Sequence, residues 1–280
     1  MDLSGKPDLT PLARVVADLR EAAPGVKPLL AGAMARDVLL THAHGVPAAR
    51  ATQDIDLAFA VRDWDGFESL RGALATSGRF TPGAVAHKFR HRDGLPVDLI
   101  PFGGVQDTRG EIAWPPGGDV VMAVSGYREA HATAVNVVLP GGIPIAVVSL
   151  PMLAALKVLA WSERHRAVPR KDAYDLVLIL AHYLDAGQRE RLYAEGGHLL
   201  NAPDFDYEHA GAWLAGRDIA ATLAAQDATV LRERIASILR GEIDPDGPLR
   251  LVGETQNPEE SRLLLSKFLD GIGSGITPAS

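Results

Sequence analysis

The stretch that decides the fold is "LLAGAMARDVLLTHAHGVPAARATQDIDLAFAV", residues 29–61. A short apolar run ends at Gly32, and the residues after it, "MARDVLL", are typical of a helix. A second apolar run, residues 53–61, carries Asp54 and Asp56 near its start. A strand that only filled a core would not carry two carboxylates at this spacing. We therefore expect a strand, a turn and a helix, followed by a strand that carries a functional site.

Asp54 and Asp56 share one face of this predicted strand, because side chains alternate with period two, while Ile55, Leu57 and Phe59 share the other. Two carboxylates about 7 Å apart repel each other unless a cation lies between them. Mg²⁺ binds one or two carboxylates together with substrate phosphates. The alternative is a strand end whose acids only face water.

A third carboxylate, Asp98, lies inside the apolar run "PVDLIPF", residues 96–102. If this run is a strand beside the first one, three carboxylates converge on one edge of a sheet. Two metal ions held in this way can activate an attacking oxygen and stabilise a leaving one. The alternative is a buried acid paired with an arginine such as Arg90.

Gly32 stands where the first strand becomes a helix, and backbone N–H groups at a helix start suit a triphosphate. A glycine at a strand–turn–helix junction is a weak signal alone, because many such turns need one. Arg36 and Asp37 lie in this helix. Arg36 either supports the phosphates or forms a surface ion pair.

A further pattern lies in "SLPMLAALKVLAWSERHRAVPRKDAYDLVLIL", residues 149–180. Lys157 stands in an otherwise apolar helix, and Asp172 heads the apolar stripe of the next helix, with Asp175 one turn along. An acid on the buried side of a helix needs a partner, and Lys157 or Arg164 would supply one. These residues either fix a helical hairpin or bind nucleotide: Lys157 the phosphates, Asp172 the base, sugar or attacking hydroxyl.

Composition excludes several classes of protein. None of the 280 residues is cysteine, which rules out disulfides, thiolate zinc sites and thiol catalysis and favours the cytoplasm. The most apolar stretch, residues 144–161, contains two prolines and a lysine, so we expect no membrane segment. A net charge of −7 argues against nonspecific coating of nucleic acid, although residues 86–92 and 164–171 are locally basic.

The order of the elements predicts an α+β protein. Residues 79–148 read as short strands separated by Gly and Pro, and the chain from Ser149 onward reads as helices. We expect a mixed-sheet catalytic domain over residues 1–148, an all-helical domain over 149–272 and a flexible tail over 273–280.

The turn "GAMARD", then "TQDID", then "VDL" on a later strand resembles the DNA polymerase beta-like nucleotidyltransferase superfamily. The downstream pattern "LxxLKxxAWxxR…RKDxxDL" resembles the AbiEii-type nucleotidyltransferase toxins of type IV toxin–antitoxin systems and their tRNA-modifying relatives. The resemblance covers roughly residues 28–185.

This resemblance implies roles for the residues singled out above. Gly32 would lie in the phosphate turn, Asp54 and Asp56 would bind metal, and Asp98 would act as general base or steady the metal. Lys157 and Asp172 match the family's downstream catalytic lysine and aspartate. The superfamily usually has Ser or Gly after the turn glycine, whereas Ala33 keeps its backbone N–H but offers no hydroxyl to a phosphate.

The leading hypothesis is therefore an Mg²⁺-dependent nucleotidyltransferase, with two metal ions, that moves an NMP from an NTP to an acceptor hydroxyl and releases pyrophosphate. The toxin resemblance suggests the 3′ end of a tRNA as acceptor and a separately encoded antitoxin as partner. One alternative is a small-molecule or protein hydroxyl as acceptor, which suits an acidic chain. Another is a catalytically weak nucleotide-binding module, for which Ala33 is the only sequence support.

Overall fold

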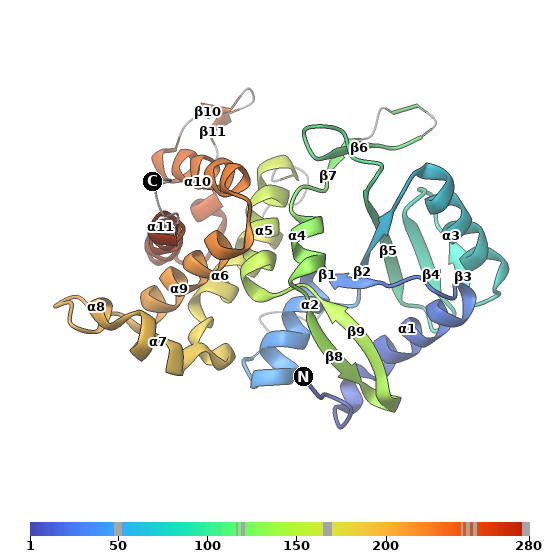
Figure 1. Ribbon diagram of the computed structural model, residues 1–280, viewed down its shortest axis with the longest axis horizontal. Helices are drawn as coiled ribbons and strands as arrows, with labels where there is room; N and C mark the ends of the chain where they lie inside the picture. Colours follow the sequence, from blue (N-terminus) through green and yellow to red (C-terminus); the bar gives the residue numbers. More distant parts are fainter. Residues whose placement is uncertain are drawn as a thin grey trace. The chain divides into compact units, whose positions relative to one another are not determined.

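The computed structural model describes residues 1–47, 52–115, 117–118, 121–164, 170–241, 243–244, 247–248 and 251–275. The chain divides into two compact units (Figure 1). Unit 1 consists of residues 1–38 and 50–149, and unit 2 consists of residues 39–49 and 150–280. In the described part of the chain, no helix has the length and apolar character needed to cross a membrane.

Unit 1 is built on a seven-stranded sheet with strand order β3-β4-β5-β2-β1-β9-β8. Its strands are β1 (Leu29–Ala31), β2 (Ile55–Val61), β3 (Phe80–Pro82), β4 (Lys88–His91), β5 (Pro96–Gly103), β8 (Val135–Leu139) and β9 (Ile143–Val147). A separate hairpin consists of β6 (Glu111–Ala113) and β7 (Val121–Ala123). The β2–β5 and β1–β9 pairs are parallel and the other pairs of the large sheet are antiparallel, so the predicted mixed sheet is confirmed.

The helices of unit 1 are α1 (Thr10–Ala22), α2 (Gly32–Asp37), α3 (Trp64–Thr76) and α4 (Tyr127–Ala132). Short 3₁₀ turns lie at Pro7–Leu9 and Pro140–Gly142. A π-helical turn at Val38–His42 follows α2 in the chain, and from Leu39 onward it belongs to unit 2. α3 begins where the Asp63 carboxylate accepts a hydrogen bond from the Gly66 N–H at 2.9 Å, a common N-cap. Its buried residues Phe67 and Leu74 recur at helical spacing and form its core-facing stripe.

The two faces of the sheet differ at β2 and β5. Ile55, Leu57 and Phe59 of β2 are almost completely buried, as the alternation predicts. Phe102 lies four residues after Asp98 on β5, so the two side chains point to the same face of the sheet. Phe102 stacks on Tyr127 of α4, with ring centroids 5.9 Å apart. α4 therefore covers the C-terminal part of the face that carries Asp98.

Unit 2 is helical in its described residues, apart from one small hairpin, and this agrees with the predicted fold class. Its helices are α5 (Leu150–Arg164), α6 (Lys171–Ala181), α7 (Arg189–Glu195), α8 (Gly197–Leu200), α9 (Tyr207–Thr222), α10 (Ala225–Arg240) and α11 (Pro258–Gly275). A π-helical turn lies at Leu184–Gln188 and a 3₁₀ turn at Leu251–Glu254, and β10 (Ile243–Asp244) pairs with β11 (Gly247–Pro248).

Two glycines allow α9 and α11 to pack with their backbones in close approach. A Cβ on Gly216 would lie 2.2 Å from the Phe268 carbonyl oxygen, and one on Gly271 would lie 2.0 Å from the Trp213 carbonyl oxygen. Only glycine fits such a helix crossing. The core of unit 2 therefore depends on these small residues as well as on its apolar ones.

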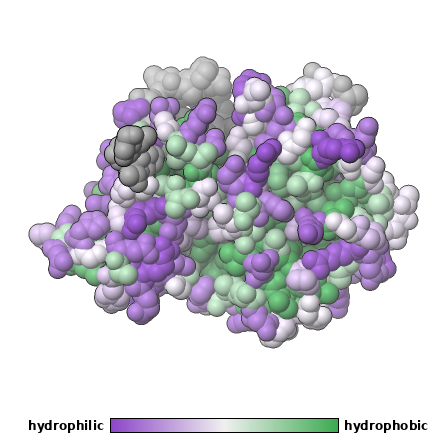
Figure 2. Space-filling view, viewed as in Figure 1, coloured by the Kyte–Doolittle hydropathy of each residue, from purple (hydrophilic) through white to green (hydrophobic). Residues whose placement is uncertain are grey.

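A polar network ties α7 to α9. Arg191 donates to Asp218 (Nη2–Oδ1 2.6 Å) and to Glu195 (Nε–Oε1 2.7 Å). Burial raises the pKa of Tyr183 well above its ordinary value, so the phenol stays protonated and donates to Asp218. The surface over α7 is mostly hydrophilic (Figure 2). Because the network links α7 to α9 through Arg191 and Asp218, we assign it a structural role.

Two local predictions differ from the structure, and one short helix was not predicted. The predicted strand 53–61 begins at Ile55, so Asp54 precedes it. The helix that was not predicted is α4, which begins at Tyr127 directly after Gly126, a glycine in the left-handed conformation. α11 continues to Gly275, so residues 273–275 of the predicted tail are helical, and residues 276–280 lie outside the described residues.

Candidate active site

The parallel pairing of β2 and β5 brings two of the predicted carboxylates together. Asp56 lies directly opposite Asp98 in the register of the two strands. Register partners on neighbouring strands point to the same face of a sheet, so both carboxylates lie on the face opposite to the buried Leu57 and Leu99. Both residues are half-buried. The apolar strands thus place two acids side by side at the N-terminal end of a parallel pair.

Asp54 is placed differently from these two. It is exposed and lies immediately before β2, two residues ahead of Asp56 in the chain. Among the residues that the structure describes, no three His, Asp or Glu side chains lie close enough together to hold a metal ion. The structure therefore assembles the pair Asp56 and Asp98, and it leaves Asp54 at the entrance to the strand.

Gly32 is in contact with Asp56. β1 pairs with β2 so that Ala31 lies opposite Asp56, and Gly32 follows with φ +66°. A Cβ built on Gly32 would lie 1.7 Å from Oδ2 of Asp56. Two requirements therefore select glycine here: the left-handed backbone conformation and the space that the Asp56 carboxylate occupies.

These two requirements can be separated by mutation. We expect Gly32→Ala to abolish activity and to destabilise unit 1 by more than the roughly 1–2 kcal/mol that a left-handed backbone alone costs, because the new methyl must displace the Asp56 carboxylate. Gly78→Ala is the matched control: Gly78 has φ +70° and nothing within 4 Å of its built Cβ. Urea denaturation and activity measurements on both variants test this, and equal effects would contradict it.

Ala33 and Arg36 are both buried in α2. Arg36 is 1% exposed and its guanidinium donates to the adjacent Asp37 carboxylate (Nε–Oδ1 2.8 Å). The ion pair that the sequence allowed is thus present, but in the interior and not on the surface. These contacts favour a role for Arg36 in holding the turn, and direct contact with phosphate stays a prediction.

Lys88 is the cationic partner of Asp98. It lies opposite Asp98 across the β4–β5 pair, with its Nζ 3.1 Å from Oδ2 of Asp98. The sequence suggested Arg90 for this position, but the Arg90 guanidinium donates to the Gly94 carbonyl at 2.6 Å. Burial lowers the pKa of the neighbouring His87, against the opposing effect of the Asp98 carboxylate. A half-buried carboxylate with one cation beside it remains accessible to substrate.

Lys157 joins α5 to α6 in unit 2. Its Nζ donates to Asp172 (Oδ1, 3.0 Å) and to Asp175 (Oδ2, 2.6 Å). Lys157 is 5% exposed, and each of the two aspartates is 1% exposed. The interhelical ion pair between Lys157 and Asp172 is therefore present, and Asp175 shares it. Catalytic roles for Lys157 and Asp172 stay predictions.

The basic stretches differ in what the structure describes. In residues 86–92, Lys88 pairs with Asp98, Arg90 donates to Gly94, and Arg92 pairs with Asp18 at 2.8 Å. In residues 164–171, the side chain of Arg164 and all of Arg166 lie outside the described residues. The three basic side chains of the first stretch are therefore exposed, but each has a partner within unit 1.

Lys88 and Asp175 were not among the residues predicted for the candidate site. Lys88 becomes a partner of Asp98 only through the antiparallel register of β4 and β5, which no local pattern encodes. Asp175 offered a signal, since it lies one turn from Asp172 on the same helix face. Asp175 could therefore have been predicted from the sequence, whereas Lys88 could not.

Comparison with known proteins gives one extensive match. The family model described as "Nucleotidyl transferase AbiEii toxin, Type IV TA system" matches residues 15–276. No curated protein matches the chain. The match extends well beyond the stretch, roughly residues 28–185, on which the resemblance rested.

Three solved structures are similar at low identity. The solution structure of the antibiotic-resistance factor ANT(2'')-Ia has 17% identity and a TM-score of 0.39, and the match covers 69% of this chain and 99% of that chain. The crystal structure of ANT(2'')-Ia in complex with adenylyl-2''-tobramycin has 17% identity, coverages of 65% and 99%, and a TM-score of 0.39. An antigenic nucleotidyltransferase-like protein from Paracoccidioides brasiliensis has 14% identity, coverages of 67% and 88%, and a TM-score of 0.39.

Proposed function

Because the chain belongs to the AbiEii nucleotidyl transferase toxin family of type IV toxin–antitoxin systems, we propose that its nucleotidyltransferase activity resides at Asp56 and Asp98 and acts on the 3′ end of a tRNA. The observation that carries this proposal is the register of β2 and β5, which sets the two carboxylates side by side against the Gly32 turn. NMP transfer from an NTP is the activity of the family, and the tRNA acceptor is the finer part of the proposal.

The donor set at this site fits Mg²⁺. Carboxylate oxygens are hard ligands, and Mg²⁺ characteristically uses one or two of them together with phosphate oxygens of the substrate. Asp56 and Asp98 supply two such groups in register, and we propose that Asp54 completes the set. When bound, Mg²⁺ would supply charge stabilisation at the α-phosphate and the leaving pyrophosphate.

The residues of the chain would then carry out an in-line displacement. The acceptor hydroxyl oxygen attacks the α-phosphorus, the bond from the α-phosphorus to the oxygen that leads to the β-phosphate breaks, and pyrophosphate leaves. We propose that the Gly32 turn and the backbone N–H of Ala33 face the triphosphate, and that Asp98 accepts the hydroxyl proton. Lys88 would hold the Asp98 carboxylate in place.

Lys157 and Asp172 enter the proposal as positioning residues. Because Lys157 is buried between Asp172 and Asp175, its ammonium is held by two carboxylates. We propose that this cluster fixes the packing of α5 against α6 within unit 2. Direct contact of Lys157 with phosphate would require it to exchange one of these carboxylates for the substrate.

The acceptor is tested with labelled nucleotide. Incubation of the protein with each α-labelled NTP, Mg²⁺ and total tRNA should place label in the tRNA band. Prior oxidation of the tRNA with periodate, which converts the 2′ and 3′ hydroxyls of the terminal ribose to aldehydes, should prevent it. Label that appears only in a small molecule or a protein contradicts the tRNA acceptor but leaves the nucleotidyltransferase intact.

A small-molecule or protein hydroxyl is the second candidate acceptor. Two observations favour it: the net charge is −7, and the three basic residues of the 86–92 stretch named above all have internal partners. A large RNA footprint rests on Lys and Arg side chains that face phosphate.

A separately encoded antitoxin is proposed as protein partner because the family is a toxin family.

Lys88 gives a test of the site's positioning. We expect Lys88→Met to lower the rate of NMP transfer on the order of 10- to 100-fold, the usual effect of removing a group that orients a ligating side chain, and Lys88→Arg to restore part of it. Arg90→Met is the control, because Arg90 is exposed on the same strand and contacts the Gly94 carbonyl. Steady-state kinetics check this, and an equal loss in both Met variants would contradict a specific role.

A further inference from the structure

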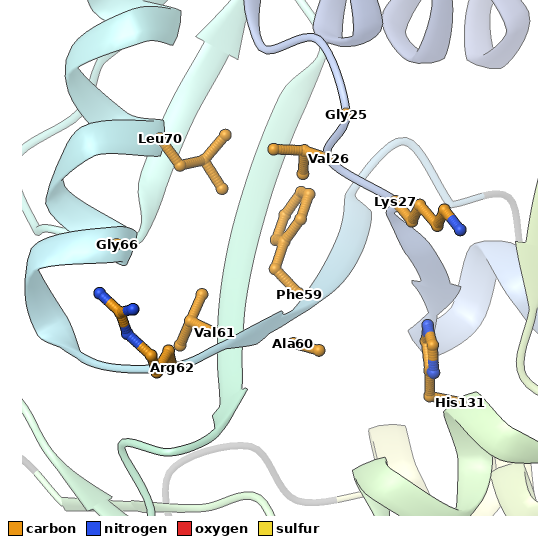
Figure 3. Close-up of a pocket in the computed structure, with 10 residues that line it drawn as sticks. All are labelled: Gly25, Val26, Lys27, Phe59, Ala60, Val61, Arg62, Gly66, Leu70 and His131. Carbon is orange, nitrogen blue, oxygen red and sulfur yellow. The ribbon is translucent and has the colours of Figure 1, made fainter.

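A hollow of about 370 Å³ lies in unit 1 at the opposite end of β2 from Asp56 (Figure 3). Its walls come from the chain before β1, the last residues of β2, the start of α3 and the end of α4, and none of its lining residues is acidic. Its volume falls within the range of about 300–1,000 Å³ that small-molecule sites occupy. The proposed function does not use this hollow.

The hollow exists because β1 is shorter than β2. β2 pairs with β5 along its whole length, but it pairs with β1 only over Asp56–Ala58. β1 begins at Leu29 because Pro28 has no N–H to continue the ladder. Beyond Ala58, the β1-side edge of β2 therefore has no described strand beside it, and Ala60 is exposed there. Such an edge offers backbone hydrogen-bonding groups to a ligand.

The side chains around this edge are divided by polarity. Figure 3 shows Val26, Phe59 and Leu70 grouped in the middle, and Lys27 and His131 together on one side. Phe59 is 1% and Leu70 is 5% exposed, so they form a firm apolar floor. This arrangement suits a ligand that has an apolar body and a charged end.

The sign of that charged end follows from the basic groups. Arg62, on the other side of the hollow, already donates to Asp63 at 2.9 Å. Among the described residues, Lys27 and His131 have no acidic partner within ion-pair distance. One full cation with an imidazole beside it matches the single charge of a carboxylate. The bidentate arginine contact that a phosphate favours would fall to Arg62, which already donates to Asp63. The absence of acids along the wall disfavours a cationic ligand.

We propose that this hollow binds the carboxylate end of a compact apolar group, with the carboxylate against Lys27 and His131 and the apolar part on Phe59. The same chemistry is present in a free aromatic acid and in the C-terminal end of a chain with an apolar last residue. In either case the exposed edge at Ala60 lies within the site and offers it backbone hydrogen bonds. This inference does not depend on the acceptor or on NMP transfer.

The probe is phenylacetate, titrated into the full chain by calorimetry and by NMR of the Ala60 amide and the His131 ring. We expect saturable binding, and binding on the order of tenfold weaker for phenylacetamide, which lacks the charge. Lys27→Met should weaken phenylacetate binding by a similar factor. Lys6→Met should not, because Lys6 is an exposed lysine away from the hollow.

A tetrapeptide ending in Phe, with a free or an amidated C-terminus, identifies the source of the ligand. Tighter binding of the peptide with the free C-terminus than of phenylacetate indicates a chain end, and weaker binding of that peptide indicates a free acid.

Several results would overturn the proposal. They are no binding at millimolar phenylacetate, equal binding of phenylacetamide, tighter binding of inorganic phosphate, or an unchanged affinity in Lys27→Met. Ala60→Leu is the second variant, since it fills the hollow and keeps every charge, and it should abolish binding. Each of these measurements is read by binding alone, so a failure of the proposed enzyme activity would leave them interpretable.

Discussion

Asp56→Asn should reduce NMP transfer by at least about 10³-fold, because loss of a carboxylate at this position removes several kcal/mol of stabilisation for the charge that develops on the α-phosphate. The substitution keeps the size of the side chain, so the contact with Gly32 and the pairing of β1, β2 and β5 should survive. Circular dichroism and thermal denaturation should therefore match the wild type, while radiolabel transfer falls to background.

Asp65→Asn is the matched control for this prediction. Asp65 is an exposed acid of α3 and lies outside the proposed site. It should keep wild-type activity. Retained transfer in Asp56→Asn, or an equal loss in both variants, would contradict the assignment of Asp56.

The second large effect concerns stability. Lys157→Met should destabilise unit 2 by about 3–5 kcal/mol, because it leaves Asp172 and Asp175 buried without the ammonium that pairs with them. Asp172→Asn and Asp175→Asn should cost less than this, and similar amounts to one another, since Lys157 keeps one carboxylate in each. Urea denaturation followed by circular dichroism measures the three changes.

Lys267→Met is the comparison, because Lys267 lies on α11 and has no ion pair among the described residues. Its effect should stay within about 0.5 kcal/mol. A stability of Lys157→Met close to that of Lys267→Met would show that the α5–α6 cluster does not hold the hairpin.

Local sequence patterns were sufficient to predict the strand that carries Asp56, the glycine turn before it and the helices after Ser149. Each depends on periodicity or turn chemistry within a few residues. The division into a mixed sheet and a helical region follows from the same signals. The short helix α4 was missed because six residues after a glycine give too little periodicity to distinguish a helix from a turn.

The geometry of the site depends on non-local pairing, and here the sequence was less informative. Nothing near Asp98 states that it lies opposite Asp56, or that its cation is Lys88 and not Arg90. A shift of one residue in register would have moved Asp98 to the other face of the sheet. The sequence also could not show that the Gly32 backbone touches the Asp56 carboxylate.

The most direct test of the account follows the two ends of one nucleotide. With a doubly labelled NTP and the wild-type protein, the α-label should enter the acceptor and the γ-label should leave as pyrophosphate, in equal amounts. Neither Asp56→Asn nor Asp98→Asn should transfer the α-label or release labelled pyrophosphate. Entry of the γ-label into the acceptor would mean phosphoryl transfer, and transfer by the two Asn variants at the wild-type level would mean that the chemistry lies elsewhere. Either result would contradict the proposal that Asp56 and Asp98 carry out NMP transfer.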